Sequence, residues 1–214
     1  MSNDDKVIDI QDCKSTNLPM ETIQYGCPLE TKECYISIVK KNNNDKFVIK
    51  SPILRVMKEP GKSDILQTYF LMVEFSEYCP NFYKQIVSIH DNLHKTITMN
   101  KDWFDYEIDE YTVIDSFQNP ICHSLDLDSL PMFLLKIPIN NGCIDCVFTD
   151  DLGNKTTIKN IHKDTSVVLT LHMNGIKFYK DKIVPDWKLI HCKISDTKLV
   201  DFREDSDEDE NLIN

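Results

Sequence analysis

Apolar and polar residues alternate over several stretches of this chain, and this pattern predicts a fold made mainly of β-strands. The stretches are rich in β-branched and aromatic residues and are separated by polar loops. The predicted strands are residues 34–39, 46–50, 67–75, 132–139, 143–148, 166–173, 176–180 and 187–194. Strands of this length and number are typical of a small closed barrel or a sandwich.

Short polar loops between these strands predict three hairpins. Residues 40–45 (KKNNND) join the first two strands, and residues 140–142 (NNG) join 132–139 to 143–148. Asn174-Gly175 stands between 166–173 and 176–180. Asn-Gly between apolar runs is a strong hairpin signal, because both residues accept a positive φ.

One segment has helical rather than strand spacing. After Pro80, with Asn81 as the expected N-cap, apolar residues recur on a single helical stripe formed by Phe82, Ile86, Ile89 and Leu93. A second, shorter helical turn is expected between Leu125 and Leu130.

The length of 214 residues fits one domain of moderate size. We expect a partly flexible N-terminal extension over residues 1–30, a folded domain over 31–200 and a disordered tail over 201–214. The polar start and the lack of a long apolar run predict neither a signal peptide nor a membrane span. The eight cysteines are therefore expected to be reduced thiols of an intracellular protein.

The last fourteen residues carry much of the net charge of −11. They hold seven acids against Arg203 alone, a net charge of −6. Such a block repels itself and is expected to be a mobile tail. It either improves solubility or acts as a tethered anion for something basic, which includes a groove on this protein. The tail residues considered for partner binding are Phe202, Glu204, Asp205, Asp207, Glu208, Asp209 and Glu210.

Positive charge gathers in two segments. Residues 32–62 hold eight bases against three acids, and residues 151–200 hold nine lysines against five aspartates. Between them, residues 102–130 hold eight acids and no Lys or Arg. The basic segments either meet on one surface or are separate solvated faces.

Aromatic residues are interleaved with the lysines in both basic segments. Single-stranded nucleic acid binds such surfaces, because bases stack on rings while cations follow the backbone. The candidate residues are Tyr35, Lys46, Lys50, Arg55, Lys177, Tyr179, Lys180, Trp187, Lys188 and Lys193. Trp187, His191 and Lys193 are expected to share one face of their strand. For Phe178 a place in the core is favoured, whereas Tyr179 and Trp187 fit either a core or a stacking role.

Catalytic signals are weak. Cys143 and Cys146 form a CxxC inside a strand pattern, without the second CxxC of a zinc ribbon or the helix of a redox motif. His90 and His94 are spaced i, i+4 on the predicted helix, but buried side chains are the favoured interpretation. No phosphate-binding glycine loop is present. We expect that the protein is not an enzyme and that it holds no metal and no cofactor.

Residues 166–194 (SVVLTLHMNGIKFYKDKIVPDWKLIHCKI) resemble the C-terminal signature of a family of single-stranded-DNA-binding proteins of phages and large nucleocytoplasmic DNA viruses. The upstream FVIKSPILRV, residues 47–56, is similar to an early strand of that family, and the acidic tail is a family hallmark. The chain departs from the relatives at Lys177, where they often have an aromatic residue, and at its end, Asn211-Leu-Ile-Asn214, where phage relatives have an aromatic residue.

The resemblance implies a mainly β OB-fold-like barrel with one inserted helix, which binds single-stranded DNA during viral DNA replication and recombination. It also implies an acidic tail that competes with DNA and recruits replication proteins, in the host cytoplasm or nucleus. The sequence leaves open whether DNA or RNA is preferred and whether the chain is a monomer or a homodimer. Three rivals remain: an acidic-tailed chaperone or scaffold for basic proteins, a thiol or metal enzyme built on Cys143 and Cys146, and a virion structural protein.

Overall fold

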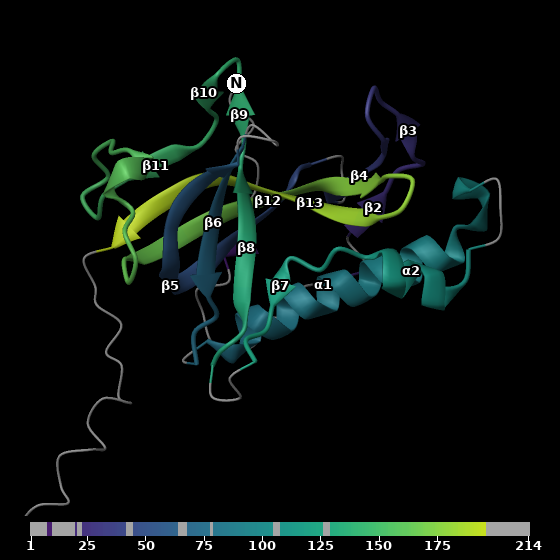
Figure 1. The fold of residues 1–214 in the computed structure, drawn as a ribbon, viewed down its shortest axis with the longest axis horizontal. Helices are drawn as coiled ribbons and strands as arrows, with labels where there is room; N and C mark the ends of the chain where they lie inside the picture. Colours follow the sequence, from purple (N-terminus) through teal and green to yellow (C-terminus); the bar gives the residue numbers. More distant parts are fainter. Residues whose placement is uncertain are drawn as a thin grey trace, which may run out of the picture.

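A computed structural model describes residues 8–9, 20, 23–41, 45–63, 68–77, 79–104, 108–125 and 129–195 of the chain (Figure 1). Its centre is a barrel of five strands: β5 (Phe47–Ser63), β6 (Thr68–Glu74), β8 (Met132–Ile137), β12 (Ser166–Phe178) and β13 (Ile183–Ser195). β5, β6 and β8 form an antiparallel meander, and β12 and β13 form a hairpin. β13 pairs with β8 in parallel, and β12 pairs with β5, which closes the ring. This is the five-stranded Greek-key barrel of the OB-fold, and the structure confirms the predicted fold class.

Shorter strands extend this sheet. They are β1 (Ile8–Asp9), β2 (Ile23–Tyr25), β3 (Leu29–Glu30), β4 (Tyr35–Lys41), β7 (Ile121–Cys122) and β11 (Val147–Thr149). β9 (Ile139–Asn140) and β10 (Cys143–Ile144) form a separate hairpin. β2 and β3 both pair with β4, so two short segments of the expected N-terminal extension add strands to the sheet.

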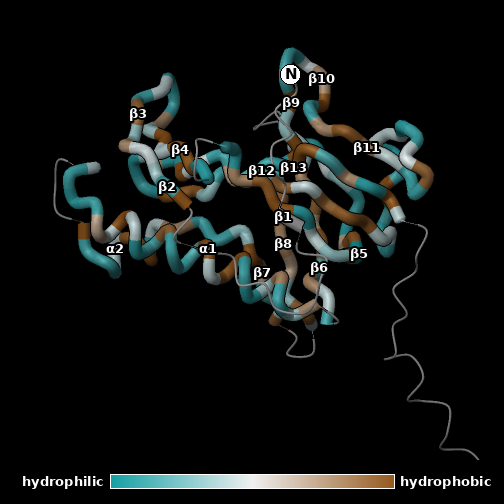
Figure 2. The backbone as a smooth tube through the Cα atoms, turned by 180° about the vertical axis from the view of Figure 1, so that it is seen from behind, coloured by the Kyte–Doolittle hydropathy of each residue, from teal (hydrophilic) through white to brown (hydrophobic). Residues whose placement is uncertain are grey.

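The inserted helix α1 (Pro80–Met99) lies between β6 and β8 in the chain. Its predicted stripe is buried, and Phe82 packs on Phe75 at a ring-centroid distance of 5.7 Å. The expected cap was wrong by two residues: the helix begins at Pro80, with Cys79 as N-cap. Proline suits this first position because its φ is already helical and its missing N–H would have no helical partner. Figure 1 shows α1 running below β12 and β13, and Figure 2 shows hydrophobic stretches along the barrel strands from behind.

A second helix, α2 (Glu110–Ser116), lies in the acidic segment, where Asp109 caps it by accepting a hydrogen bond from the Thr112 N–H at 2.7 Å. The helical turn that we expected at 125–130 is not found in its described residues, 125, 129 and 130, and residues 126–128 lie outside the described part of the chain. Two short 3-10 helices, η3 (Lys101–Trp103) and η4 (Ile158–Asn160), complete the described elements. No helix among the described residues is long and apolar enough to cross a membrane.

One of the three predicted turns differs from the structure. Asn141-Gly142 does form a hairpin turn between β9 and β10, with φ values of 50° and 77°. Asn174-Gly175 does not turn, because β12 continues through it to Phe178. The β12–β13 turn lies four residues later, where the Tyr179 N–H donates to the Lys182 carbonyl at 2.9 Å.

At Asn174-Gly175, β12 instead forms a bulge and changes its partner. Met173 pairs with Phe47 of β5, whereas Gly175 pairs with Ile38 of β4. A Cβ on Gly175 would lie 2.4 Å from the Ser37 carbonyl oxygen, so glycine is needed for close approach rather than for a turn. The predicted turn between β4 and β5 is closed by the antiparallel bridge Lys40–Lys46 and by the Lys41 N–H, which donates to the Asp45 carbonyl at 2.8 Å. We call residues 174–186, which extend past the barrel beside β4, the arm.

The cysteines also differ from expectation. Cys79 is disulfide-bonded, so the prediction of eight reduced thiols is wrong at this position. The free cysteines among the described residues are Cys27, Cys34, Cys122, Cys143, Cys146 and Cys192.

Candidate nucleic-acid interface

Two lysines face each other where the barrel closes. Lys136 of β8 pairs with Lys188 of β13 in the parallel register. Both side chains point outward, because their neighbours Leu135 and Trp187 are buried in the core. Like charges directly opposite in a sheet are unfavourable without a counter-ion. The closing strands therefore present a concentrated positive charge to the surface.

A buried carboxylate lies beside this pair. Asp186 accepts a hydrogen bond from Asn174 Nδ2 at 2.8 Å, and it forms ion pairs with Lys177 Nζ at 3.0 Å and Lys188 Nζ at 3.9 Å. Burial raises the pKa of Asp186, but the neighbouring lysines and Asn174 outweigh it and the net shift is downward. Asp186 therefore stays ionised and holds Lys177 in position.

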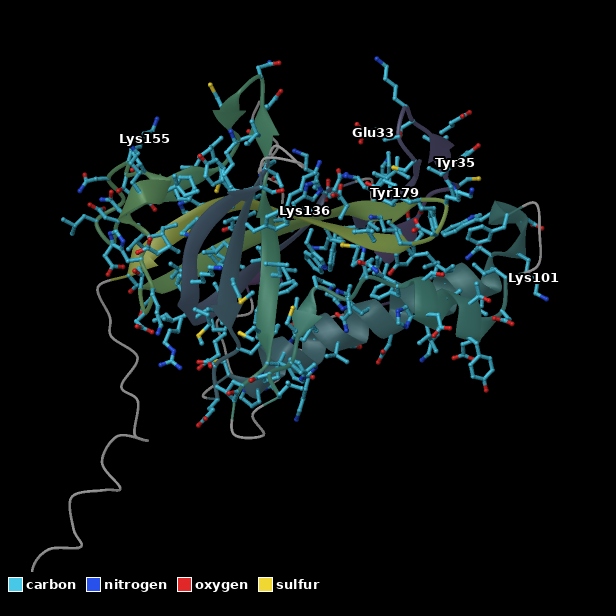
Figure 3. The ribbon with its side chains drawn as sticks, viewed as in Figure 1. Glu33, Tyr35, Lys101, Lys136, Lys155 and Tyr179 are labelled. Carbon is cyan, nitrogen blue, oxygen red and sulfur yellow. The ribbon has the colours of Figure 1, made fainter. Side chains whose placement is uncertain are left out.

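The arm adds further cations and an aromatic ring. Burial and then the charge of Lys177 lower the pKa of Lys136, and Lys182 contributes to this repulsion. Lys182 Nζ also lies 5.3 Å from the ring centroid of Tyr179, a cation–π contact. Lys136, Lys177 and Lys188, which lie around Asp186, are called the arm cluster below together with Lys182 of the arm turn. Figure 3 shows Lys136 and Tyr179 along β8 and the arm.

A second group of cations lies further along the same strands. Lys50 of β5 and His191 of β13 both pair with Thr170 of β12. Burial lowers the pKa of His191, and the nearby Lys50 and Lys193 lower it further. Lys193 Nζ contacts Asp151 Oδ1 at 2.9 Å, and His191 Nε2 lies 3.0 Å from Thr149 Oγ1. Lys50, His191 and Lys193 are called the barrel cluster.

Trp187 is not on this surface, and its prediction as a stacking residue is corrected. Its side chain is 2% exposed, its Nε1 donates to His90 Nε2 at 3.1 Å, and its ring meets Phe133 edge-on at 6.0 Å. The physical reason is a bulge at Ile190: Leu189 pairs with Leu171, but His191 already pairs with Thr170. One extra residue reverses the alternation, so Trp187 does not share a face with His191 and Lys193 as we expected.

The other predicted residues are dispersed. Tyr35, which is 50% exposed, pairs with Phe178 and so lies on the face of the sheet opposite to Lys177. Phe178 packs against Phe104 at 5.5 Å, in the core as favoured. Lys46 is exposed at the β4–β5 bridge, and Lys180 is exposed at the arm turn.

Arg55 lies outside both clusters. Its Nε and Nη2 contact Glu74 Oε2 at 3.1 and 2.7 Å, and it pairs with Ser166 at the start of β12. At a rise of ~3.3 Å per residue, this position is roughly 35 Å along β12 from Lys177 but only two residues, roughly 7 Å, beyond the partner of Lys193. The structure therefore places Arg55 next to the end of the barrel cluster, with its charge paired to Glu74.

Sequence reasoning missed Lys136 and Asp186. Lys136 is the one charged residue in the apolar stretch 132–139, and that isolation was a usable signal. Asp186 carried no signal, because its partners Asn174 and Lys177 are brought to it only by the register of the hairpin. The predicted tail residues lie outside the described part of the chain.

Burial determines the properties of the cysteine and histidine candidates. Burial raises the pKa of the Cys146 thiol to about 12, which is the opposite of an activated nucleophile. Burial lowers the pKa of His90 to about 3, and its Nε2 accepts the Trp187 hydrogen bond. Within the described ranges, no three His, Cys, Asp or Glu side chains are grouped to hold a metal ion.

Comparison with known proteins bears on the fold. No protein-family model matches the chain, and no curated protein matches its sequence. The single-stranded DNA-binding protein from bacteriophage Enc34 in complex with ssDNA matches with a TM-score of 0.50 and 10% identity, over 81% of this chain and 96% of that chain. A C-terminal truncation of the same phage protein matches with a TM-score of 0.49 and 10% identity, over 84% of this chain and 98% of that chain. Another structure of the phage protein matches with a TM-score of 0.47 and 11% identity, over 84% of this chain and 95% of that chain. The chain thus has the fold seen in a phage single-stranded-DNA-binding protein.

Proposed function

We propose that this protein binds single-stranded DNA through the outward face of β8, β12 and β13. The observation that carries the proposal is the arm cluster, in which Lys136, Lys177 and Lys188 share the single buried carboxylate of Asp186 on the surface of an OB-fold barrel and so leave a net positive charge there. The similarity to a phage protein solved in complex with ssDNA supports the same ligand class.

Binding of this kind has a simple physical basis. Phosphates approach the ammonium groups of the arm cluster and relieve their repulsion, while Tyr179 offers a partly exposed ring for stacking. Release of counterions makes such binding weaken steeply as salt rises. These contacts recognise backbone charge and base faces, so RNA strands are a second ligand of the same chemistry.

We further propose a role in viral DNA replication and recombination, at sites of replication in the host cytoplasm or nucleus. The support is the resemblance of residues 166–194 to the viral and phage family and the family-like acidic tail. In this proposal the tail recruits replication proteins and competes with DNA for the clusters. The protein acts as a binding protein and not as an enzyme.

Replacing Lys136 and Lys188, which pair where β8 meets β13, is the direct test of the binding face. The Lys136→Gln/Lys188→Gln variant is expected to bind labelled oligo-dT roughly 10- to 100-fold more weakly, since two charge-assisted contacts are lost. Its log affinity should also fall less steeply with log salt, by about 1.4 in slope for two phosphate contacts to a single strand. Fluorescence anisotropy at two salt concentrations measures both.

The matched control removes the same two charges elsewhere. Lys84 and Lys95 are exposed on α1, on the side of β13 that Trp187 faces, away from Lys188. Lys84→Gln/Lys95→Gln is expected to change affinity by less than about 3-fold. Equal losses in the two double variants would show only a dependence on net charge, and the proposed face would be wrong.

Removing the tail tests its competition with DNA. A chain that ends at Val200 is expected to bind oligo-dT more tightly than the full chain, because the tethered anion is gone. The tightening should shrink as salt rises. An unchanged affinity would contradict the competition. If the full chain binds no DNA, and if removal of the tail abolishes its binding to basic proteins, the rival chaperone or scaffold function is favoured.

A further inference from the structure

The Ile190 bulge brings the two cation clusters onto one face of the barrel. Lys188 pairs with His172, His191 with Thr170 and Lys193 with Val168. These β12 partners are every second residue of an uninterrupted stretch, so they share one face. Without the extra residue in β13, His191 and Lys193 would point away from Lys188. The bulge therefore redirects the barrel cluster to the side of the arm cluster.

The stretch between the clusters is suited to a polyanion. Thr170 and His172 occupy it on β12, and neither carries negative charge at neutral pH. The sequences of β12 and β13 contain one carboxylate, Asp186, which is buried and paired with lysines. Asp151, from the neighbouring loop, is held by Lys193. Positive charge thus runs along the strands without an exposed acid in these two sequences.

The distance between the clusters sets the length of strand that reaches both. From Lys177 to Val168, the partner of Lys193, β12 advances nine residues, or roughly 30 Å at ~3.3 Å per residue. A stacked strand has one phosphate per ~3.4 Å, so about nine nucleotides cover this distance and an extended strand needs fewer. The facing ends of the two clusters are closer: Lys188 and Lys193 pair with His172 and Val168, roughly 13 Å apart along β12, so a strand that stays within one cluster has about 3 nucleotides.

We infer that a single nucleic-acid strand lies lengthwise along β12 and β13, from the arm cluster to the barrel cluster, so that Lys50, His191 and Lys193 form a second, separable phosphate site. The inference rests on the proposed function. It assigns the two clusters different roles: the arm cluster binds strands of any length, and the barrel cluster adds affinity only for longer strands. A strand that crosses the barrel over the outward residues of β6 is the competing path.

Oligo-dT of two lengths tests the inference. The Lys50→Gln/Lys193→Gln variant is expected to bind a strand of about 15 nucleotides roughly 10-fold more weakly than the unchanged chain, and a strand of about 3 nucleotides within about 2-fold. Lys136→Gln/Lys188→Gln is expected to weaken both lengths. Equal loss at both lengths, or no loss at either, in the Lys50/Lys193 variant would overturn the lengthwise path. If the unchanged chain binds neither strand, the proposed function itself is wrong.

Protection of lysines in the unchanged chain gives a second readout that needs no variant. An amine-reactive reagent is applied with the short strand, with the long strand and without DNA, and each lysine is then quantified by mass spectrometry. Lys193 is expected to be protected by the long strand alone, and Lys188 by both. Protection of Lys193 by the short strand, or by neither, contradicts the inference.

Discussion

Replacing Trp187 with alanine is expected to lower the free energy of unfolding by about 3–5 kcal/mol, the usual cost of removing a large buried aromatic side chain. The indole is 2% exposed and packs against Phe133, so alanine leaves a cavity in the core. It also removes the hydrogen bond to His90 Nε2, whose ring is itself buried and gains no new partner from alanine. Urea denaturation followed by circular dichroism measures the loss.

The same substitution separates the core role from the stacking role that the sequence suggested. Tyr179→Ala, on the partly exposed arm, is the matched aromatic control, and it is expected to weaken oligo-dT binding with little change in stability. A Trp187→Ala variant as stable as the unchanged chain but impaired in DNA binding would place the indole on the surface and contradict the structure.

Gly175→Ala is also expected to lower the free energy of unfolding, because the added side chain would clash with a neighbouring strand. The added Cβ would lie 2.4 Å from the Ser37 carbonyl oxygen and 3.2 Å from the Ile36 side chain. Because the first of these is backbone, relief requires that β4 move away from β12, which breaks the pairing of Gly175 with Ile38. We expect a loss of at least about 2–3 kcal/mol in unfolding free energy, comparable to other strained or overpacked core sites. Thermal and urea denaturation report it.

Gly61→Ala provides the control. A Cβ there meets no atom within 4 Å, and Gly61 lies in β5, away from the arm. Alanine at this position is expected to be neutral or slightly stabilising, because it restricts the unfolded chain. If Gly175→Ala were tolerated as well as Gly61→Ala, close packing of β4 on β12 could not explain the glycine.

Local signals in the sequence predicted those features that depend on neighbouring residues. The strands follow from alternation, and α1 follows from the spacing of Phe82, Ile86, Ile89 and Leu93, which are all buried. Asn141-Gly142 forms the predicted turn because its two flanking strands are short and pair with each other. In each case the information lies within a few residues.

The features that sequence missed depend on distant partners. Asn174-Gly175 has the same composition as a turn, but β12 continues because β5 and β4 provide consecutive partners for it, one on each side of the bulge. Trp187 was predicted on the wrong face of β13, because one extra residue in the strand reverses the alternation of inward and outward side chains. Such a bulge does not change the composition of the strand. Lys136 joins the site through pairing with Lys188, some fifty residues later in the chain. Lys177, Lys180 and Lys188 were predicted as a group because one hairpin carries all three.

The parallel contact between β8 and β13 has a thermodynamic consequence for the empty protein. The described register of that contact consists of Lys136 opposite Lys188, with Asp186 as the nearby carboxylate, so the closed barrel holds more positive than negative charge at this contact. Closure and occupancy by a polyanion are then coupled equilibria: phosphate that neutralises the pair favours the closed ring, and closure in turn assembles the site. We therefore expect local opening along this contact to be less frequent when a polyanion is bound.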